Sequence, residues 1–92
     1  MALESVEKQP AEVMSFDINF SEWLDNRGED AASVTATAAS GITLVSTYLI
    51  GKAARCRFSG GTTGQTYKVT VQLTTATGLV KEYDFNVKVK EL

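Results

Sequence analysis

The side chains that could act as nucleophiles in this sequence have no base to activate them. The 92-residue chain contains many serine and threonine residues and one cysteine, Cys56, but no histidine. Histidine is the usual general base beside a nucleophile, so neither a Ser–His nor a Cys–His arrangement can form. A pair of carboxylates could in principle hydrolyse sugars, but the acidic residues are dispersed along the chain. We therefore expect no enzymatic activity and no catalytic residue.

Two loops resemble ligand-binding loops in composition but not in spacing. Asp25, Glu29 and Asp30 could offer oxygen ligands to calcium, but they lack the spacing of a calcium loop. Arg27, which lies between them, would oppose a cation. The segment Gly60–Gly64 is rich in glycine, yet a phosphate cradle needs a following helix and this segment precedes a strand. We expect neither a metal site nor a bound cofactor.

Three side chains are candidates for contacts with a partner protein. Arg55 and Arg57 are two residues apart and so share one face of a predicted strand. They could lie on a solvated sheet face, or they could bind carboxylates of a neighbouring subunit through their forked donors. Trp23 follows a predicted strand and could anchor an interface. A lone tryptophan at a strand end more often covers the core, and we favour that interpretation.

The composition argues against several classes of partner. Charged residues make up 22% of the chain, the net charge is −2, and the Lys and Arg residues are scattered. A phosphate backbone requires a basic surface, so we expect no binding of nucleic acid. The sequence has neither an apolar run of about 20 residues nor a signal sequence. We expect no association with membranes. We expect the protein to be made in the cytoplasm.

Alternation of apolar and polar residues predicts a β-hairpin near the C-terminus. Thr66–Thr75 and Leu79–Val89 each place apolar side chains on one face. Gly78 lies between them, where a tight turn needs a positive φ. Shorter stretches with strand character are Met14–Phe20, Ala32–Ala38, Ile42–Ile50 and Ala53–Phe58. The pattern leaves open which side chains of Ile42–Ile50 face the core.

Six short strands separated by turns predict an all-β fold, a single immunoglobulin-like antiparallel β-sandwich. Tyr67 follows a loop and opens a strand, which is typical of a tyrosine corner, although an ordinary half-buried tyrosine fits equally well. Cys56 alternates with Ala54 and Phe58, so we expect a buried and unreactive thiol. Ser21 could cap a single helical turn after the first strand.

The first residues of the chain lack the pattern of the remainder. Residues 1–12 contain Glu4, Glu7, Lys8 and Glu12 and little apolar content. We interpret them as an extended, flexible N-terminal arm and residues 13–92 as the immunoglobulin-like domain. Such an arm either frays in solution or orders on a partner. We expect that removing residues 1–12 leaves the unfolding midpoint of the isolated body nearly unchanged but weakens incorporation into particles.

Five segments occur in a specific order along the chain, namely Asp17–Leu24, Ala32–Ala38, Gly41–Thr43, Ser59–Tyr67 and Thr74–Gly78. This order resembles a family of small virion proteins of tailed bacteriophages. The plan of that family is a strand ending in Trp-Leu, followed by an immunoglobulin-like body with a Ser-Gly-Gly-Thr-x-Gly-x-x-Tyr turn. The resemblance spans nearly the whole chain.

The resemblance implies a non-enzymatic structural protein of the virion, an immunoglobulin-like fiber–tail adaptor that joins tail and tail fiber by protein–protein docking. Its partners would be other virion proteins of the tail, fiber or capsid, and it would be present in multiple copies. Two alternatives remain, a capsid decoration or cement protein on the phage head and a carbohydrate- or cell-surface-binding module. The missing signal sequence and the single tryptophan argue against the last.

Overall fold

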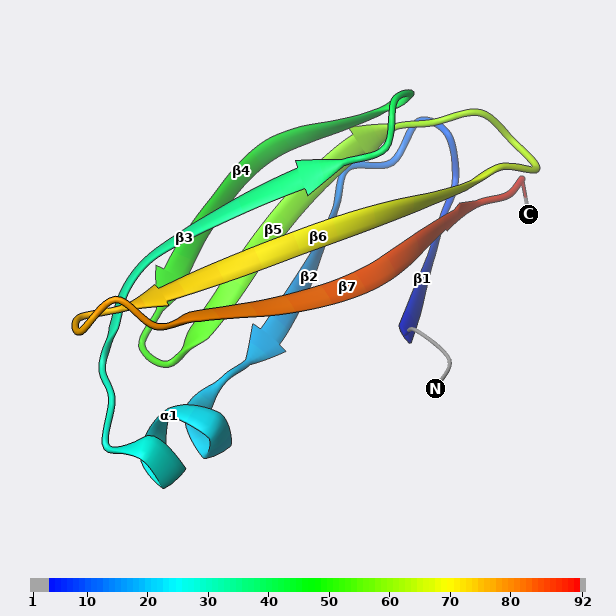
Figure 1. Ribbon diagram of the computed structural model, residues 1–92. Coiled ribbons are helices and arrows are strands. Elements are labelled where there is room, and N and C mark those ends of the chain that lie inside the picture. The colour runs from blue at the N-terminus through cyan, green and yellow to red at the C-terminus, as the bar shows by residue number, and fades with distance from the viewer. Residues whose placement is uncertain (1–3, 92) are drawn as a thin grey trace.

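The structure is a computed structural model that describes residues 4–91 as seven strands and one short helix (Figure 1). In chain order the elements are β1 (Glu4–Lys8), β2 (Met14–Asn19), α1 (Ser21–Arg27), β3 (Ala31–Ala38), β4 (Ile42–Ile50), β5 (Ala53–Gly60), β6 (Thr66–Thr75) and β7 (Val80–Val89). Residues 1–3 of the predicted arm lie outside the described residues. There is one strand more than the six expected, because β1 forms near the N-terminus.

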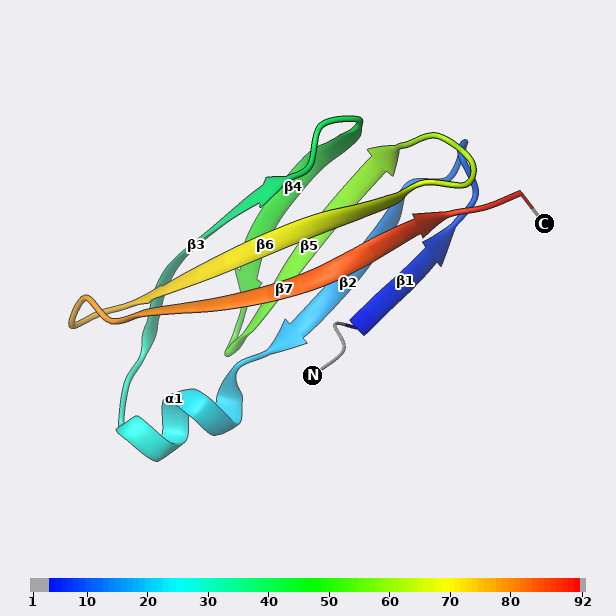
Figure 2. The same cartoon turned by 45° about the vertical axis from the view of Figure 1, so that its right-hand side comes forward.

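The strands form two sheets that face each other (Figures 1 and 2). The order is β1-β7-β6-β3 in the four-stranded sheet and β2-β5-β4 in the three-stranded sheet. All neighbouring strands are antiparallel except β1 and β7, which run parallel. The predicted β-sandwich is thus confirmed, with one parallel pair in place of a wholly antiparallel arrangement.

The core lies between the sheets, where alternate side chains of both sheets point inward. The fully buried side chains of the β6–β7 hairpin include Val69, Val71, Leu73, Phe85 and Val87. The ring centroid of Phe85 lies 4.5 Å from that of Phe16 and 6.0 Å from that of Phe58, both in the opposite sheet. Cys56 is buried as predicted, and its burial raises the pKa of the thiol.

The prediction of a flexible arm is wrong for residues 4–8. These residues form β1, which pairs with residues 85–89 of β7 and extends the four-stranded sheet. Val6 packs against the core, but Glu4 and Lys8 lie on the same face of the strand. Because two of its three core-side residues are charged, β1 shows no apolar alternation in the sequence. That is the physical reason why the strand was missed.

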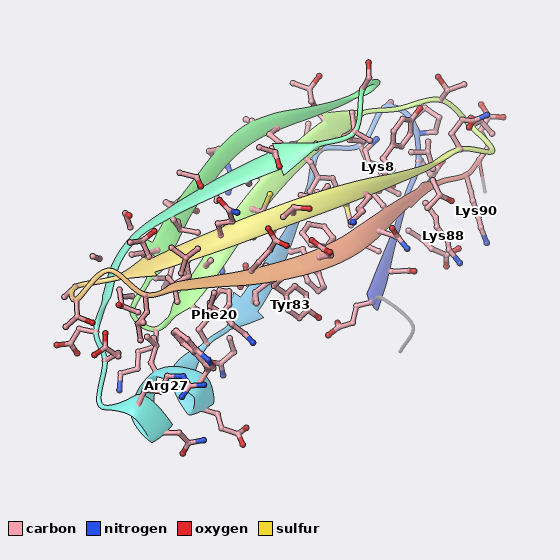
Figure 3. All side chains as sticks on the ribbon, in the orientation of Figure 1. Lys8, Phe20, Arg27, Tyr83, Lys88 and Lys90 are labelled. Carbon is pink, nitrogen blue, oxygen red and sulfur yellow. The ribbon has the colours of Figure 1, made fainter. Side chains whose placement is uncertain are left out.

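Lys8 is only 2% exposed although its side chain is charged, and it holds the end of β1 in place. Its Nζ donates hydrogen bonds to the carbonyl oxygens of Gln9, Pro10 and Gly60 at 2.7, 3.1 and 2.6 Å. An ammonium group has three donors, so these three acceptors satisfy it and permit its burial (Figure 3). The bond to Gly60 ties β1 to the end of β5 in the opposite sheet.

The core-facing side of β4 changes part-way along the strand. A β-bulge between Leu44 and Ser46 adds one residue, Val45, opposite β5. Even-numbered residues face the core before the bulge and odd-numbered residues face it afterwards. The change leaves Val45, Tyr48 and Ile50 exposed at 53%, 39% and 42%. It also explains why the sequence pattern of this strand was ambiguous.

The helix α1 closes one end of the core and is longer than the single turn expected. Ser21 is its first residue and its side chain forms no cap, so the predicted capping role is wrong. Instead, Asn19 Oδ1 accepts a hydrogen bond from the N–H of Ser21 at 2.9 Å. The helix ends at Gly28, whose φ of 64° is the left-handed conformation typical of a C-terminal glycine. Leu24 is fully buried beneath it.

Tyr67 forms a tyrosine corner, one of the two alternatives that the sequence left open. Its Oη accepts a hydrogen bond of 2.8 Å from the N–H of Thr62. Its ring lies between two glycines with positive φ: a Cβ on Gly41 would lie 2.7 Å from Tyr67 Cε1, and one on Gly61 would lie 3.1 Å from Cε2. Tyr67 therefore holds the loop after β5 against the turn between β3 and β4.

Candidate interaction surfaces

Arg55 and Arg57 share the outer face of the three-stranded sheet, on the side of β5 away from the core. Arg55 is paired within the chain, because its Nε and Nη2 donate hydrogen bonds of 2.8 and 2.9 Å to the two carboxylate oxygens of Asp17 on β2. These bonds hold the pKa of Asp17 below its ordinary value. Arg55 therefore presents an ion pair, not a free cation, to any partner.

Arg57 is the more available of the two arginines. It is exposed and lies between Ser15 of β2 and Ser46 of β4 in the register of the sheet. Among residues 4–91, no carboxylate lies within ion-pairing distance of its guanidinium. Its forked donors are therefore free to bind a carboxylate group of another protein.

Trp23 lies on α1, half-buried, and packs against the core. The guanidinium carbon of Arg27 is 5.2 Å and the Nζ of Lys81 is 5.9 Å from the centroid of its ring. Cations at these distances are attracted to the electron-rich face of an indole. Trp23 thus covers the end of the core, as favoured from the sequence, and two cations flank its ring. One of them, Arg27, is labelled in Figure 3 at the end of the molecule that α1 occupies.

Several polar side chains on the outer face of the four-stranded sheet are paired with one another. Asp84 of β7 accepts a hydrogen bond of 2.7 Å from the hydroxyl of Thr70 and lies 3.4 Å from the Nζ of Lys68. Next along the hairpin, Gln72 Nε2 donates a hydrogen bond of 3.0 Å to Glu82. These polar groups satisfy one another, so they have less to gain from a partner than Arg57 has.

The loop that follows α1 uses its carboxylates within the chain. Asp25 forms an ion pair with Lys52, and Glu29 accepts a hydrogen bond from the hydroxyl of Thr77, which lowers the pKa of Glu29. In the part of the chain that the structure describes, no three His, Cys, Asp or Glu side chains are grouped to hold a metal ion. The contact with Thr77 braces the turn between β6 and β7.

Residues 4–91 also contain no helix with the length and apolar character of a membrane span.

A hollow of about 300 Å³ opens between β2 and β7, and it is lined by Glu4, Phe16, Asp17, Ile18, Asn19 and Tyr83. Glu4 accepts a hydrogen bond from the Tyr83 hydroxyl, and this bond raises the pKa of Tyr83 to about 12. The other carboxylate in the lining, Asp17, is bound to Arg55. Both acids are therefore already engaged, and the hollow offers no unpaired carboxylate as a base or ligand.

The sequence reasoning missed the apolar side chains exposed on β4, which are Val45, Tyr48 and Ile50. Their exposure follows from the bulge, which the pattern did not predict. One available signal was the absence of any charged residue between residues 31 and 51. Two further exposed apolar residues, Leu79 and Val80, lie where β7 begins, next to the turn after β6.

A protein-family model described as "Podophage GP4 fiber-tail adaptor protein gp77" matches residues 8–88. The chain belongs to this family. The match runs from the end of β1 almost to the end of β7 and includes both sheets, α1 and the tyrosine corner. The resemblance drawn from the order of the sequence segments is confirmed. Comparison with curated protein sequences found no match.

The fold of the adaptor also occurs in a solved structure of distant sequence. The solution structure of the PKD domain from KIAA 1837 protein matches with a TM-score of 0.59 and 20% identity, over 97% of this chain and 80% of that chain. At this identity the likeness concerns the fold alone, and it confirms the immunoglobulin-like sandwich. The family itself makes the adaptor a structural protein of the phage virion that interacts with other virion proteins.

Proposed function

We propose that the adaptor joins a phage tail to its tail fiber by protein–protein docking, in repeated copies and without an enzymatic step. The observation that supports this most strongly is the match to the fiber-tail adaptor family over residues 8–88. The match covers α1 and the strands from β2 to β6 in full, together with nearly all of β7. We also propose that the protein is made in the host cytoplasm before it enters the particle.

A protein that joins two others needs two surfaces that can be occupied at once. The sandwich is elongated, with extents of 43 × 27 × 19 Å. The helix α1 and the turn between β6 and β7 lie at one end, and the loop between β5 and β6 lies at the other (Figures 1 and 2). A partner bound at the α1 end would leave the outer face of the three-stranded sheet free for a second partner.

We assign one docking surface to the arginine-bearing face and the other to the α1 end. On the first, Arg57 is available for a carboxylate, and the Arg55–Asp17 pair beside it fixes the charge pattern that a partner meets. On the second, Trp23 is flanked by Arg27 and Lys81. Tryptophan and arginine are among the residue types that are enriched at the energetic hot spots of interfaces.

The location of the protein in the virion tests the adaptor role. A C-terminal label detected by electron microscopy is expected at the junction of tail and fiber. Label on the head would contradict the adaptor role and support a capsid decoration protein. Absence of label from the particle, together with binding of the isolated protein to host glycans, would support a carbohydrate-binding module.

The docking surface can be tested by a matched pair of charge changes. Arg57→Gln and Lys88→Gln each remove one cation from an exposed position, but Lys88 lies on β7 in the other sheet. We expect Arg57→Gln to reduce incorporation into particles while Lys88→Gln leaves it unchanged, with both variants folded by circular dichroism. Normal incorporation of the Arg57→Gln variant would exclude Arg57 from docking.

A further inference from the structure

The two sides of the sandwich differ in how their edge strands are protected. On one side the edges are β1 and β2, which carry Glu4, Glu7 and Asp17 at exposed positions. On the other side the edges are β3 and β4, and residues 31–51, which include both strands, contain no charged residue (Figure 1). Edge strands of soluble proteins usually carry charges or proline that prevent pairing with another chain. The β3–β4 side lacks such charges and proline, and the bulge at Val45 leaves Ser46–Ile50 of β4 as a regular edge.

Of these two unprotected strands, β4 is the one suited to pairing. It hydrogen-bonds in its sheet only to β5, so the backbone groups on its other edge have no strand partner. It also exposes Val45, Tyr48 and Ile50, whereas the exposed residues of β3 are small, such as Ser33 and Thr35. Pairing at β4 would satisfy backbone groups and bury apolar side chains together.

We infer that β4 pairs with β4 of a second copy of this chain, antiparallel and about a two-fold axis. A partner strand with charged side chains would meet no opposite charge along residues 31–51. The chain itself supplies an uncharged strand of the required kind in β4. Two-fold pairing uses the free edges of both copies and closes the assembly at two. The sheets would join as β2-β5-β4 to β4-β5-β2.

The bulge determines the register of the pair. Regular pairing can extend only from Ser46, after the bulge, to Ile50, where β4 ends. The middle residue of this segment is Tyr48, so the two-fold axis passes beside it and places Tyr48 opposite Tyr48 of the second copy. Ile50 then lies opposite Ser46 of the second copy. Directly opposed residues lie on one face of a sheet, so the tyrosine rings pack side by side.

This inference rests on the repeated copies in the proposed function, but it can be tested on the isolated full-length chain. Sedimentation equilibrium from low to high micromolar concentration should show a monomer–dimer equilibrium. Tyr48→Lys would place two cations opposite each other and should raise the dimer dissociation constant by at least about tenfold. Ser5→Lys, which adds the same charge to β1 on the protected side, should leave the dissociation constant unchanged.

A lysine at position 48 would lie beside Arg55 of the same chain, so its charge could also disturb the monomer. Ile50→Lys is therefore a second disrupting variant, because residue 50 lies opposite the uncharged Ala53. A monomeric wild-type protein, a dimer that tolerates the substitutions on β4, or equal loss in Ser5→Lys would each overturn the inference. None of these results would bear on the adaptor role, which is read from the position of the label in virions.

The register has its own test by disulfide formation. In an antiparallel pair, opposed Cα atoms are about 4.5–5.5 Å apart, which is within the range that a disulfide spans. Tyr48→Cys should therefore give a covalent dimer on mild oxidation. Ser46→Cys should not, because the two copies of residue 46 would be offset by roughly 13 Å along the strands. The native Cys56 is buried and does not interfere. Equal cross-linking of both variants would contradict the register.

Discussion

The hydroxyl of Tyr67 makes one hydrogen bond whose contribution to stability can be measured. It accepts from the N–H of Thr62, in the loop between β5 and β6. We expect Tyr67→Phe to lower the free energy of unfolding by about 1 kcal/mol, the net contribution of one such bond. Ser33→Ala also removes a hydroxyl, from an exposed position on β3, and should change stability by less than about 0.5 kcal/mol. An unchanged denaturation midpoint for Tyr67→Phe would remove the tyrosine corner as a stabilising contact.

The glycines beside the Tyr67 ring are expected to be intolerant of a side chain. Gly41→Ala would place a Cβ 2.7 Å from Tyr67 Cε1, at a φ of 109°. Gly78 has a similar φ of 98° but open space around it, so Gly78→Ala measures the backbone strain alone. We expect both variants to lose about 1 kcal/mol from the positive φ. Gly41→Ala should lose a further 1–3 kcal/mol or so from overpacking. Equal losses in chemical denaturation would show that the ring moves aside freely.

The thiol of Cys56 should be unreactive in the folded protein, because it is buried and its pKa is raised by that burial. A thiol reagent should label it slowly in buffer and rapidly in denaturant. The raised pKa also predicts a pH dependence. Above about pH 8.5 the unfolded state loses the thiol proton before the folded state does, so stability falls. Cys56→Ala should lack this part of the decline. Rapid labelling of the native protein would contradict the burial.

At the scale of elements, β1 is expected to contribute to stability and not to behave as a loose arm. Deleting residues 1–8 removes the strand and the ammonium group that three carbonyl oxygens share. Lys8→Met keeps most of the side-chain volume but leaves those carbonyl oxygens without their donor, which should cost about 1–3 kcal/mol. The deletion should cost more than the substitution. A deletion variant that unfolds at the same denaturant concentration as the full chain would restore the arm interpretation.

The elements that the sequence predicted well are those whose core-facing residues are all apolar. In β6 the alternation of Val69, Val71 and Leu73 with polar residues corresponds directly to the buried positions. The elements that failed depend on information outside the local pattern. The core side of β1 carries Lys8, which becomes buried only because Gly60 and the residues after β1 offer carbonyl oxygens. The bulge in β4 depends on its pairing with β5.

The candidate site residues show the same division. Alternation placed Arg55 and Arg57 on one face of β5, and the structure agrees. It could not show that Asp17, distant in sequence, lies opposite Arg55 and neutralises it. The exposed stripe on β4 was likewise hidden, because the bulge decides which residues of β4 face outward. A single sequence does not show which residues of neighbouring strands are paired. That pairing distinguishes Arg57, which has no carboxylate partner among the described residues, from Arg55, which binds Asp17.

At the scale of the whole molecule, the residues alone indicate a small sandwich without catalytic groups, and many proteins share such a body. The PKD domain shows this, since it has the same fold at 20% identity. The order of several short segments indicates the virion role, and the family match over residues 8–88 confirms the resemblance. The fold therefore follows from the alternation and burial of side chains, whereas the function follows from family membership.

The adaptor role is tested most directly by counting tail fibers on particles that lack this protein. Phage with the coding sequence deleted should assemble heads and tails, but electron microscopy should show tails without fibers. Purified wild-type protein, added together with free fibers, should restore attachment to those tails, and the Arg57→Gln variant should restore it less well. Particles that carry a full set of fibers without the protein would contradict the account.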